Sequence, residues 1–203
     1  MIARAASALV AGAALLVCAA AVAASLASAA QQGEAPPSKG GAPKETFAFD
    51  IPDLDGGHIA SRDLKGKIVI VDVWGTWCAP CRQAIPHLVN MQRRFGPRGL
   101  VVVGISAERG ADYGTAVRRV EEFAQEMGIN YRLGLIDERT YAEIKRLMRY
   151  EGESFTVPTT ILLDRDGSIL ARYPGYFFGQ EKELAELIRQ RLSREGNGGE
   201  PEP

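Results

Sequence analysis

Cysteine and histidine are scarce in this chain, whose 203 residues include three cysteines and two histidines. Cys18 lies near the N-terminus, so Cys78 and Cys81 form the only pair in the rest of the chain. Structural zinc sites usually take four such ligands, and c-type haem attachment needs a histidine directly after the second cysteine, where Arg82 stands. The sequence therefore predicts no metal site, no haem attachment and no disulfide scaffold.

An excess of charge of one sign is also lacking. The chain has 24 basic and 25 acidic side chains, a net charge of −1. Nucleic-acid-binding domains usually carry a clear positive excess, so we expect no nucleic-acid partner. The length and the 46% hydrophobic content suit one folded domain with appendages rather than two domains.

The N-terminal 30 residues are poor in charge. Arg4 is the only charged side chain before Glu34, and the Ala-rich run between them ends in Ala27-Ser28-Ala29, which has the small-x-small form of a cleavage site. Residues 1–30 are therefore predicted to be a signal peptide or, if uncut, an N-terminal membrane anchor. Under either alternative the folded part is exported, and we expect an extracytoplasmic, periplasmic location where disulfides persist.

Composition also divides the remainder of the chain. Residues 31–43 are rich in Gly, Pro and Ser without apolar periodicity, which predicts a flexible linker. Residues 44–192 carry alternating strand-like and helix-like patterns and are predicted to form the domain. Residues 193–203 consist largely of Gly, Glu and Pro, which predicts a disordered tail.

The segment Trp77-Cys78-Ala79-Pro80-Cys81 carries the chemistry. It follows an apolar run of strand length at 68–74 and opens a helix-compatible segment at about 80–95. A thiol at the first turn of a helix faces unpaired N–H groups and the positive end of the dipole, which favour the thiolate. Cys78 is the predicted nucleophile, which must be reachable by a partner, and Cys81 is the predicted resolving thiol. The only redox group expected is their disulfide, without a further cofactor, since a purely structural disulfide across so short a loop stabilises little.

Residues 71–82, read as Val-Asp-Val-Trp-Gly-Thr-Trp-Cys-Ala-Pro-Cys-Arg, resemble the active-site segment of thioredoxin-like proteins. From about 46 to 190 the sequence resembles the extracytoplasmic TlpA/ResA-type disulfide reductases. The alternation of strands and helices by itself predicts a layered α/β sheet. The resemblance implies a thioredoxin-like three-layer α/β/α fold with a central mixed sheet, an N-terminal β-hairpin extension and an inserted helix–strand segment.

The same resemblance implies roles for residues around the cysteines. Trp77 is expected to contact substrate, while Trp74 and Pro80 are expected to be structural. Pro86 lies inside the predicted helix and is expected to kink it. His87 and His58 are expected to lie on the surface, away from any metal.

Asp72 is the one polar residue in the run 68–74. Burial in such a strand is costly for a carboxylate, so its pKa should be raised. Two interpretations stay open, a hydrogen-bonded acid that serves packing or a proton acceptor for Cys81. Thioredoxins have a buried acid at this place, whereas ResA relatives often have Asn there and a Glu three residues after the second cysteine. This chain has Ala84 at that offset, so we infer that Asp72 has taken over the role.

The segment 156–160, Thr-Val-Pro-Thr-Thr, resembles the cis-proline loop of thioredoxin-like proteins. The likeness implies a cis Val157–Pro158 bond next to the cysteines, with the Val157 backbone free to pair with an extended substrate and Thr159 in the same binding loop. Alternatively the proline merely begins a strand. Farther on, Phe177 and Phe178 are expected to pack under the last helix rather than to rim a groove.

The residues between the cysteines bear on the direction of electron flow. Ala79 and Pro80 supply no cation or imidazole to stabilise the Cys78 thiolate, which predicts a reducing protein. We expect a reductase of disulfides in exported proteins, re-reduced by a membrane thiol donor. The resemblance implies substrates such as the haem-binding cysteine pair of apocytochrome c. A dithiol oxidase or isomerase, and a non-catalytic redox-sensing or binding module, remain alternatives.

Overall fold

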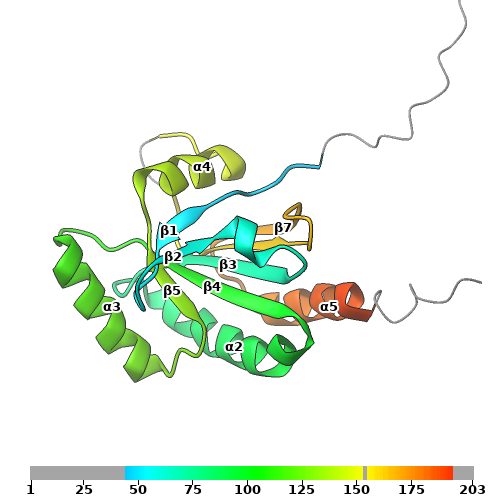
Figure 1. The fold of residues 1–203 in the computed structure, drawn as a ribbon. Helices are drawn as coiled ribbons and strands as arrows, with labels where there is room; N and C mark the ends of the chain where they lie inside the picture. The colour runs from blue at the N-terminus through cyan, green and yellow to red at the C-terminus, as the bar shows by residue number, and fades with distance from the viewer. Residues whose placement is uncertain (1–43, 153–154, 194–203) are drawn as a thin grey trace, which may run out of the picture. The chain divides into compact units, whose positions relative to one another are not determined.

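The fold is seen in a computed structural model that describes residues 44–152 and 155–193 (Figure 1). The predicted leader at 1–30, the linker at 31–43 and residues 194–203 of the predicted tail lie outside the described residues. Ser193, predicted to begin the tail, is instead the last residue of the final helix. The elements are, in chain order, β1 (Asp50–Pro52), β2 (His58–Ala60), the 3-10 helix η1 (Ser61–Leu64), β3 (Ile68–Trp74), α2 (Ala79–Phe95), the 3-10 helix η2 (Gly96–Arg98), β4 (Leu100–Ser106), α3 (Tyr113–Met127), β5 (Arg132–Leu135), α4 (Glu138–Met148), β6 (Thr159–Leu163), β7 (Ile169–Pro174) and α5 (Gln180–Ser193).

Five strands form one mixed sheet in the order β5-β4-β3-β6-β7. The pairs β3–β4 and β4–β5 are parallel, whereas β6 runs antiparallel to both β3 and β7. The parallel strands β3 and β4 read as continuous apolar runs because both of their faces are covered. The predicted mixed sheet of a thioredoxin-like fold is confirmed. In the sequence, α3, β5 and α4 lie between β4 and β6.

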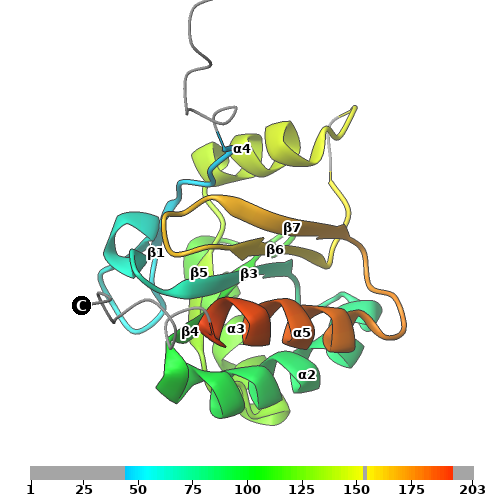
Figure 2. The same ribbon diagram turned by 90° about the vertical axis from the view of Figure 1, so that its right-hand side faces the viewer.

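Helices cover both faces of this sheet. Figure 2 shows α4 above the sheet, with α2 and α5 side by side beneath it. On the α4 side, its buried Ile144 and Leu147 pack against the β3 valines and against apolar residues of the N-terminal segment. On the other side, α2 and α5 bury an apolar stripe against β3, β4 and β6, and α3 packs beside the first turns of α2. No helix among the described residues is both long and apolar enough to cross a membrane.

Strand β3 alternates its side chains between these two cores. Val69, Val71 and Val73 belong to the cluster on the α4 side. Ile68 and Ile70 belong to the cluster under α2 and α5, and the period of two in a strand places Asp72 and Trp74 on that same face. The acid is therefore directed to the side of the sheet that α2 covers.

Helix boundaries follow local capping chemistry. Asp112 accepts a hydrogen bond from the Thr115 N–H at the start of α3, and the left-handed Gly128 ends the helix. Asp137 accepts from the Thr140 N–H in the same way, so α4 starts at Glu138. The helix ends at Met148 because the next residue, Arg149, adopts the left-handed conformation.

The predicted N-terminal hairpin is present as β1 and β2, but it forms a two-stranded sheet of its own. It meets the edge strand β5 through one isolated bridge, Asp53 with Gly134, and through a hydrogen bond of 3.0 Å from the Leu54 N–H to the Leu133 carbonyl. A side chain at Gly134 would place its Cβ 2.5 Å from the Pro52 carbonyl oxygen, so glycine permits this close approach. The extension is thus attached at the sheet edge rather than continuous with it.

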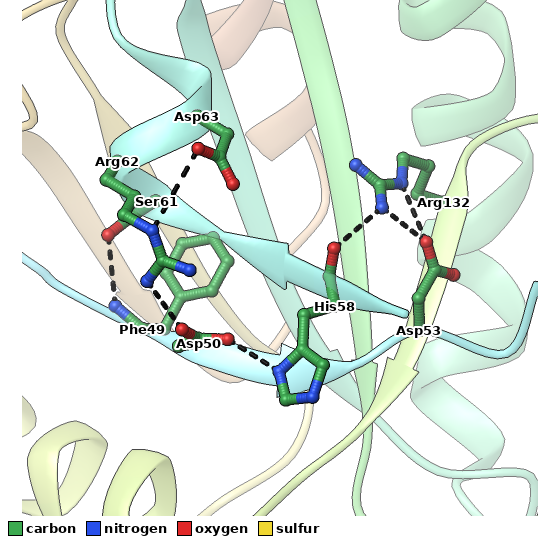
Figure 3. A network of polar contacts seen from close by, with 8 residues as sticks. All are labelled: Phe49, Asp50, Asp53, His58, Ser61, Arg62, Asp63 and Arg132. Atoms are coloured by element: carbon green, nitrogen blue, oxygen red, sulfur yellow. Dashed lines mark hydrogen bonds and ion pairs between the residues drawn. The ribbon is translucent and has the colours of Figure 1, made fainter. Parts of the chain in front are cut away.

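A network of charged groups fastens the hairpin (Figure 3). The Asp53 side chain is 4% exposed and accepts two hydrogen bonds from the Arg132 guanidinium at the start of β5, the Nε donor lying at 3.0 Å. The same guanidinium donates to the His58 carbonyl at 3.0 Å. The His58 ring is exposed, as predicted, and its Nδ1 lies 2.7 Å from Asp50, whose pKa is lowered by Arg62 and by His58. Arg132 therefore ties both hairpin strands to β5.

Replacing Arg132 by Met should destabilise the domain by about 1–3 kcal/mol, because the buried Asp53 carboxylate loses its charged partner. Urea unfolding measures the change. Arg119→Met, on the exposed surface of α3, is the matched control and should stay within about 0.5 kcal/mol of the parent. Adding Asp53→Asn to Arg132→Met should restore part of the loss. Equal midpoints for the two arginine variants would contradict the assignment.

Candidate active site

The cysteine pair lies where β3 passes into α2. Cys78 is the N-cap of the helix, and Pro80 follows in its first turn, where the missing N–H of proline costs nothing. The two cysteines form a disulfide, with their Cα atoms 5.3 Å apart. The Cys78 sulfur also accepts a hydrogen bond of 3.2 Å from the Cys81 N–H. The helix start thus offers Cys78 the environment that stabilises a thiolate.

The exposure of the pair differs from the expectation of a reachable nucleophile. Cys81 is fully buried and only 3% of Cys78 is exposed, although the neighbouring Trp77, Ala79 and Pro80 are all exposed. In this oxidised form the pair is almost entirely buried. A partner therefore has to reach the Cys78 sulfur between the flanking side chains, or those side chains have to move.

Trp77 is held in place from the β4 side. The residue is 42% exposed, and its Nε1–H donates to the Ala107 carbonyl at 3.1 Å. The Arg109 guanidinium lies over the ring, 3.8 Å from its centroid. A partly exposed indole that is fixed in this way forms a rigid apolar surface beside Cys78.

The segment before β6 approaches the cysteines from another direction. The Val157–Pro158 peptide bond is cis, the isomer that the resemblance implies. Val157 packs against the cluster that contains both cysteines, and its backbone makes no hydrogen bond with another described residue. The Pro158 carbonyl accepts from the Gly175 N–H at 2.7 Å, which ties this segment to the loop after β7.

Thr159, predicted to belong to the substrate-binding loop, has a side chain that does not reach the surface. Thr159 is fully buried, its hydroxyl donates to the Thr156 carbonyl at 2.5 Å, and the Tyr150 hydroxyl lies 3.3 Å away. The pairing of Thr159 with Val73 at the end of β3 turns this side chain inward. The threonine braces the loop rather than facing a partner.

A hollow of about 490 Å³ is bounded by Trp77, the residue before Cys78, and by Val157, which packs against the cluster of the cysteines. Its other lining residues are Ala107, Glu108, Arg109, Ile136, Tyr141 and Phe155. Aromatic and aliphatic groups thus line it together with one cation and one carboxylate. A hollow of this kind suits an apolar side chain of an extended segment that reaches the cysteines.

Glu108 is a site residue that the sequence reasoning missed. Its carboxylate accepts from the Thr76 N–H at 2.9 Å, from the Thr76 hydroxyl at 2.8 Å and from the Ser106 hydroxyl at 3.0 Å. These bonds hold the turn that presents the cysteine pair. Its place just after a parallel strand was the available signal, since functional groups gather at the carboxyl ends of such strands.

Asp72 is fully buried and has no charged partner among the described residues that shifts its pKa. Burial raises the pKa of this carboxyl from 3.8 to about 7, opposed only by a hydrogen bond of 2.8 Å from the Thr160 hydroxyl. That hydroxyl in turn accepts from the Gln180 amide at 3.3 Å. The predicted upward shift is confirmed, and an acid with a pKa of about 7 exchanges protons at neutral pH.

The remaining residues predicted around the site fall into place with one exception. Trp74 is fully buried and packs against Phe123, with ring centroids 5.1 Å apart. Pro86 lies inside α2, and His87 stacks on Tyr176 with centroids 6.4 Å apart. The exception is the loop after β7. Phe177 is 47% exposed and Phe178 is 91% exposed, so the expectation that both pack under α5 is wrong.

The described residues contain no group of three or more His, Cys, Asp or Glu side chains arranged to hold a metal ion. The nearest cation to the cysteines in sequence, Arg82, is directed away from them. Its guanidinium pairs with Glu126 at 3.0 Å and lies 4.5 Å from the Phe123 ring centroid. The chemistry available at this site is therefore that of a disulfide, a helix start and a buried acid.

The mixed sheet, the cysteine pair at a helix start and the proline segment opposite it define the thioredoxin-like class of proteins. Residues 43–172 match the model of the AhpC/TSA family, and the chain belongs to that family. Its relatives and structural neighbours make it a thiol:disulfide oxidoreductase.

Among the similar sequences is the thiol-disulfide oxidoreductase ResA of Bacillus cereus, 29% identical over 150 residues, which are 74% of this chain and 78% of the relative. The thioredoxin-like protein YneN of Bacillus subtilis is 30% identical over 138 residues, 66% of this chain and 72% of the relative. A solved structure from Chlorobium tepidum, described as a thiol:disulfide interchange protein DsbE, is 25% identical and superimposes with a TM-score of 0.60, covering 73% of this chain and 96% of the other.

The raised pKa of Asp72 gives a stability prediction with a definite sign. The carboxyl ionises near pH 4 in the unfolded chain but only near pH 7 in the folded one, so the free energy of unfolding should fall as the pH rises from about 4 to 7. The difference between the two pKa values corresponds to about 4 kcal/mol. Asp72→Asn should remove this decline and be the more stable protein at pH 8, by up to that amount.

Urea unfolding of the oxidised protein at pH 4, 6 and 8 measures the effect. Asp63→Asn, at an exposed position in η1, is the control and should keep the pH dependence of the parent. Parallel stability curves for Asp72→Asn and the parent would show that the carboxyl is not held neutral by burial.

Proposed function

We propose that this oxidoreductase is exported and reduces disulfides in extracytoplasmic proteins, and that a membrane thiol donor then re-reduces it. The haem-binding cysteine pair of an apocytochrome c is the substrate class that we favour. The observation that carries the proposal is the Cys78–Cys81 disulfide at the start of α2, above a buried acid whose pKa is about 7.

The catalytic cycle would proceed by two exchanges. The Cys78 thiolate attacks one sulfur of the substrate disulfide, a new S–S bond forms, and the other substrate sulfur leaves as a thiolate. Cys81 then gives up its proton and attacks the Cys78 sulfur, which releases the second substrate sulfur. The substrate gains two electrons and, with protons from Cys81 and from solvent, two thiols. The protein is left with the Cys78–Cys81 disulfide, the form seen in this structure.

Asp72 is the proposed acceptor of the Cys81 proton. It lies on the face of β3 that α2 covers, two residues before the end of the strand, and Cys81 is buried in the first turn of that helix. The pKa of about 7 matches the carboxyl to transfer at neutral pH, because neither protonation state is strongly favoured there. A salt-bridged carboxylate with a lowered pKa would be a poorer base.

Substrate would bind across the hollow beside the disulfide. The free backbone of Val157 can pair with an extended peptide, and the fixed ring of Trp77 supplies apolar contact area on the opposite side. Because Cys78 is only 3% exposed, an extended and locally unfolded segment should reach it more readily than a compact domain. This favours substrates that have not yet folded, such as an apocytochrome.

The reducing direction is supported by the described residues that follow Cys78 in sequence, none of which directs a cationic group at its sulfur. The residues Ala79 and Pro80 carry none, and Arg82 is engaged by Glu126 and Phe123. A thiolate without added stabilisation gives a lower reduction potential. We therefore expect the potential of the purified protein to lie below about −200 mV when equilibrated with glutathione or dithiothreitol. A value well above that would point to a dithiol oxidase or isomerase.

Cys81→Ser should retain its physiological partner as a mixed disulfide on Cys78, because the second exchange is blocked while the first remains. The variant is made in the full chain with Cys18→Ala, so that no other thiol can capture a protein. Mass spectrometry identifies what is attached. Exported proteins with a cysteine pair, among them c-type apocytochromes, are expected.

Cys78→Ser/Cys81→Ser in the same background is the matched control and should capture nothing. Multiple turnover of a model disulfide should be lost in Cys81→Ser, while Cys78 still reacts once. Undiminished turnover would exclude the dithiol cycle and favour a role as a binding or sensing module. Capture restricted to cytoplasmic proteins would refute the proposed location.

A further inference from the structure

One oxygen of the Asp72 carboxyl has no hydrogen-bond partner among the described residues. Oδ1 accepts from the Thr160 hydroxyl, whereas the buried Oδ2 is unpaired. A neutral acid tolerates such a site, but an ionised carboxylate needs donors, because an unpaired buried charge is costly. The proton transfer proposed above makes Asp72 ionised for part of each cycle, so donors near Oδ2 would matter.

Two buried donors in the same region are also unpaired. They are the Trp74 Nε1–H and the Tyr131 hydroxyl, neither of which has a partner among the described residues. Trp74 follows Asp72 by two residues on the same face of β3. Tyr131 precedes β5 and packs between the cluster under α2 and the cluster that holds the cysteines. Unpaired buried donors are rare in folded proteins, so two beside an unpaired acceptor call for an explanation.

Gly104 brings these groups together. It is the direct partner of Asp72 in the parallel pair of β3 and β4. A Cβ on Gly104 would lie 2.9 Å from the Trp74 Nε1 and 3.1 Å from the Tyr131 Cε2, and it would lie 2.6 Å from a Leu133 methyl. The missing side chain is therefore what admits the indole and the phenol ring next to the acid.

Tyr131 also connects this buried position with the surface. Its hydroxyl is buried, while other parts of the side chain line two surface hollows, one with Gln92 and Asn130 and one with Glu121 and Gln125. Burial and the nearby Asp72 raise the pKa of this phenol well above its usual value, so it stays protonated. It is thus a permanent hydrogen-bond donor at the acid.

We propose that Tyr131 is a positioning residue for Asp72, whose hydroxyl donates to Oδ2 when the carboxyl ionises, with the Trp74 N–H as a second donor. The proposal rests on the proposed function, because it concerns the proton acceptor of the second exchange. The step is the one already described. The Cys81 proton passes to Asp72, the Cys81–Cys78 bond forms and the departing sulfur takes the electron pair. Tyr131 transfers nothing and acts by stabilising the charged carboxylate beforehand.

The other groups facing Asp72 do not perform this task. Thr160 on β6 is bonded to the opposite oxygen, and Gln180 at the start of α5 donates to Thr160 rather than to the acid. Cys81 on α2 is the group being deprotonated, and Gly104 on β4 has no side chain. No described cation shifts the proton affinity of Asp72. Tyr131 and Trp74 are the remaining donors.

Tyr131→Phe tests the proposal, because it removes only the hydroxyl. The reduced full chain, carrying Cys18→Ala, is mixed with the coloured disulfide DTNB in a stopped-flow instrument. The first release of thiolate forms the mixed disulfide on Cys78, and the second reports its resolution by Cys81. The pH midpoint of the second phase should rise by about one unit or more in Tyr131→Phe, with a rate about tenfold lower below the midpoint. The first phase should be unchanged.

Two further variants separate positioning from packing. Tyr113→Phe, at an exposed position in α3, should leave both phases as in the parent. In an Asp72→Asn background, Tyr131→Phe should have no further effect, since the group through which it acts is gone. An unshifted midpoint in Tyr131→Phe, or an equal slowing in both backgrounds, would overturn the proposal.

The assay does not depend on the physiological substrate, so failure of the proposed reductase role would show in the trapping experiment and not here. If Tyr131→Phe does not fold, carbon-13 NMR of the unmodified reduced protein decides the matter. The Tyr131 Cζ shift should then follow the titration of the Asp72 carboxyl with the same midpoint. A Tyr131 shift that is constant through that titration would overturn the proposal.

Discussion

The burial of one carboxyl without a countercharge is the constraint on which the rest of the site depends. Asp72 lies in the central strand β3, which is covered on both faces, so water cannot stabilise its charge. One neutral donor, the Thr160 hydroxyl, is bonded to the carboxyl, and the buried donors of Trp74 and Tyr131 are unpaired in this oxidised form. A cation at the same place would hold the acid ionised and lower its pKa. Burial without a cation raises the pKa of Asp72 to about 7, so the carboxyl can both take up and release a proton near that pH. The proposed transfer of the Cys81 proton depends on this property.

Topology explains why distant segments meet at the cysteines. The parallel strands β3 and β4 have their carboxyl ends at the same end of the sheet, so the turn before Cys78 lies beside Glu108 and Arg109. Strand β6 is antiparallel to β3, so the amino end of β6 lies there and brings the cis Val157–Pro158 segment. The cysteine pair, the residues after β4 and the proline segment therefore meet at one end of the sheet. The hairpin that Arg132 holds is attached at the β5 edge of the sheet.

The low exposure of Cys78 and the hollow beside it bear jointly on the kind of partner. Only 3% of Cys78 is exposed, and Trp77 and Val157 both line the neighbouring hollow. A partner that presents an extended segment can place an apolar side chain in this hollow while its sulfur approaches Cys78. In the proposed reductase cycle the oxidised form described here is the final state, with both cysteines at the helix start.

Much of the fold and of the site could be predicted from the sequence because the sequence patterns that indicate them are local. The apolar run at 68–74 matched β3, and the cysteine spacing with Pro80 identified a helix start, since capping and periodicity act over a few residues. The raised pKa of Asp72 also followed from its lone place in an apolar strand. Only the tertiary structure decided that Thr160, Gly104 and Tyr131 surround that acid, that Thr159 turns inward and that Phe178 is exposed. These outcomes depend on strand register and on the packing of segments far apart in the chain, which no local pattern encodes.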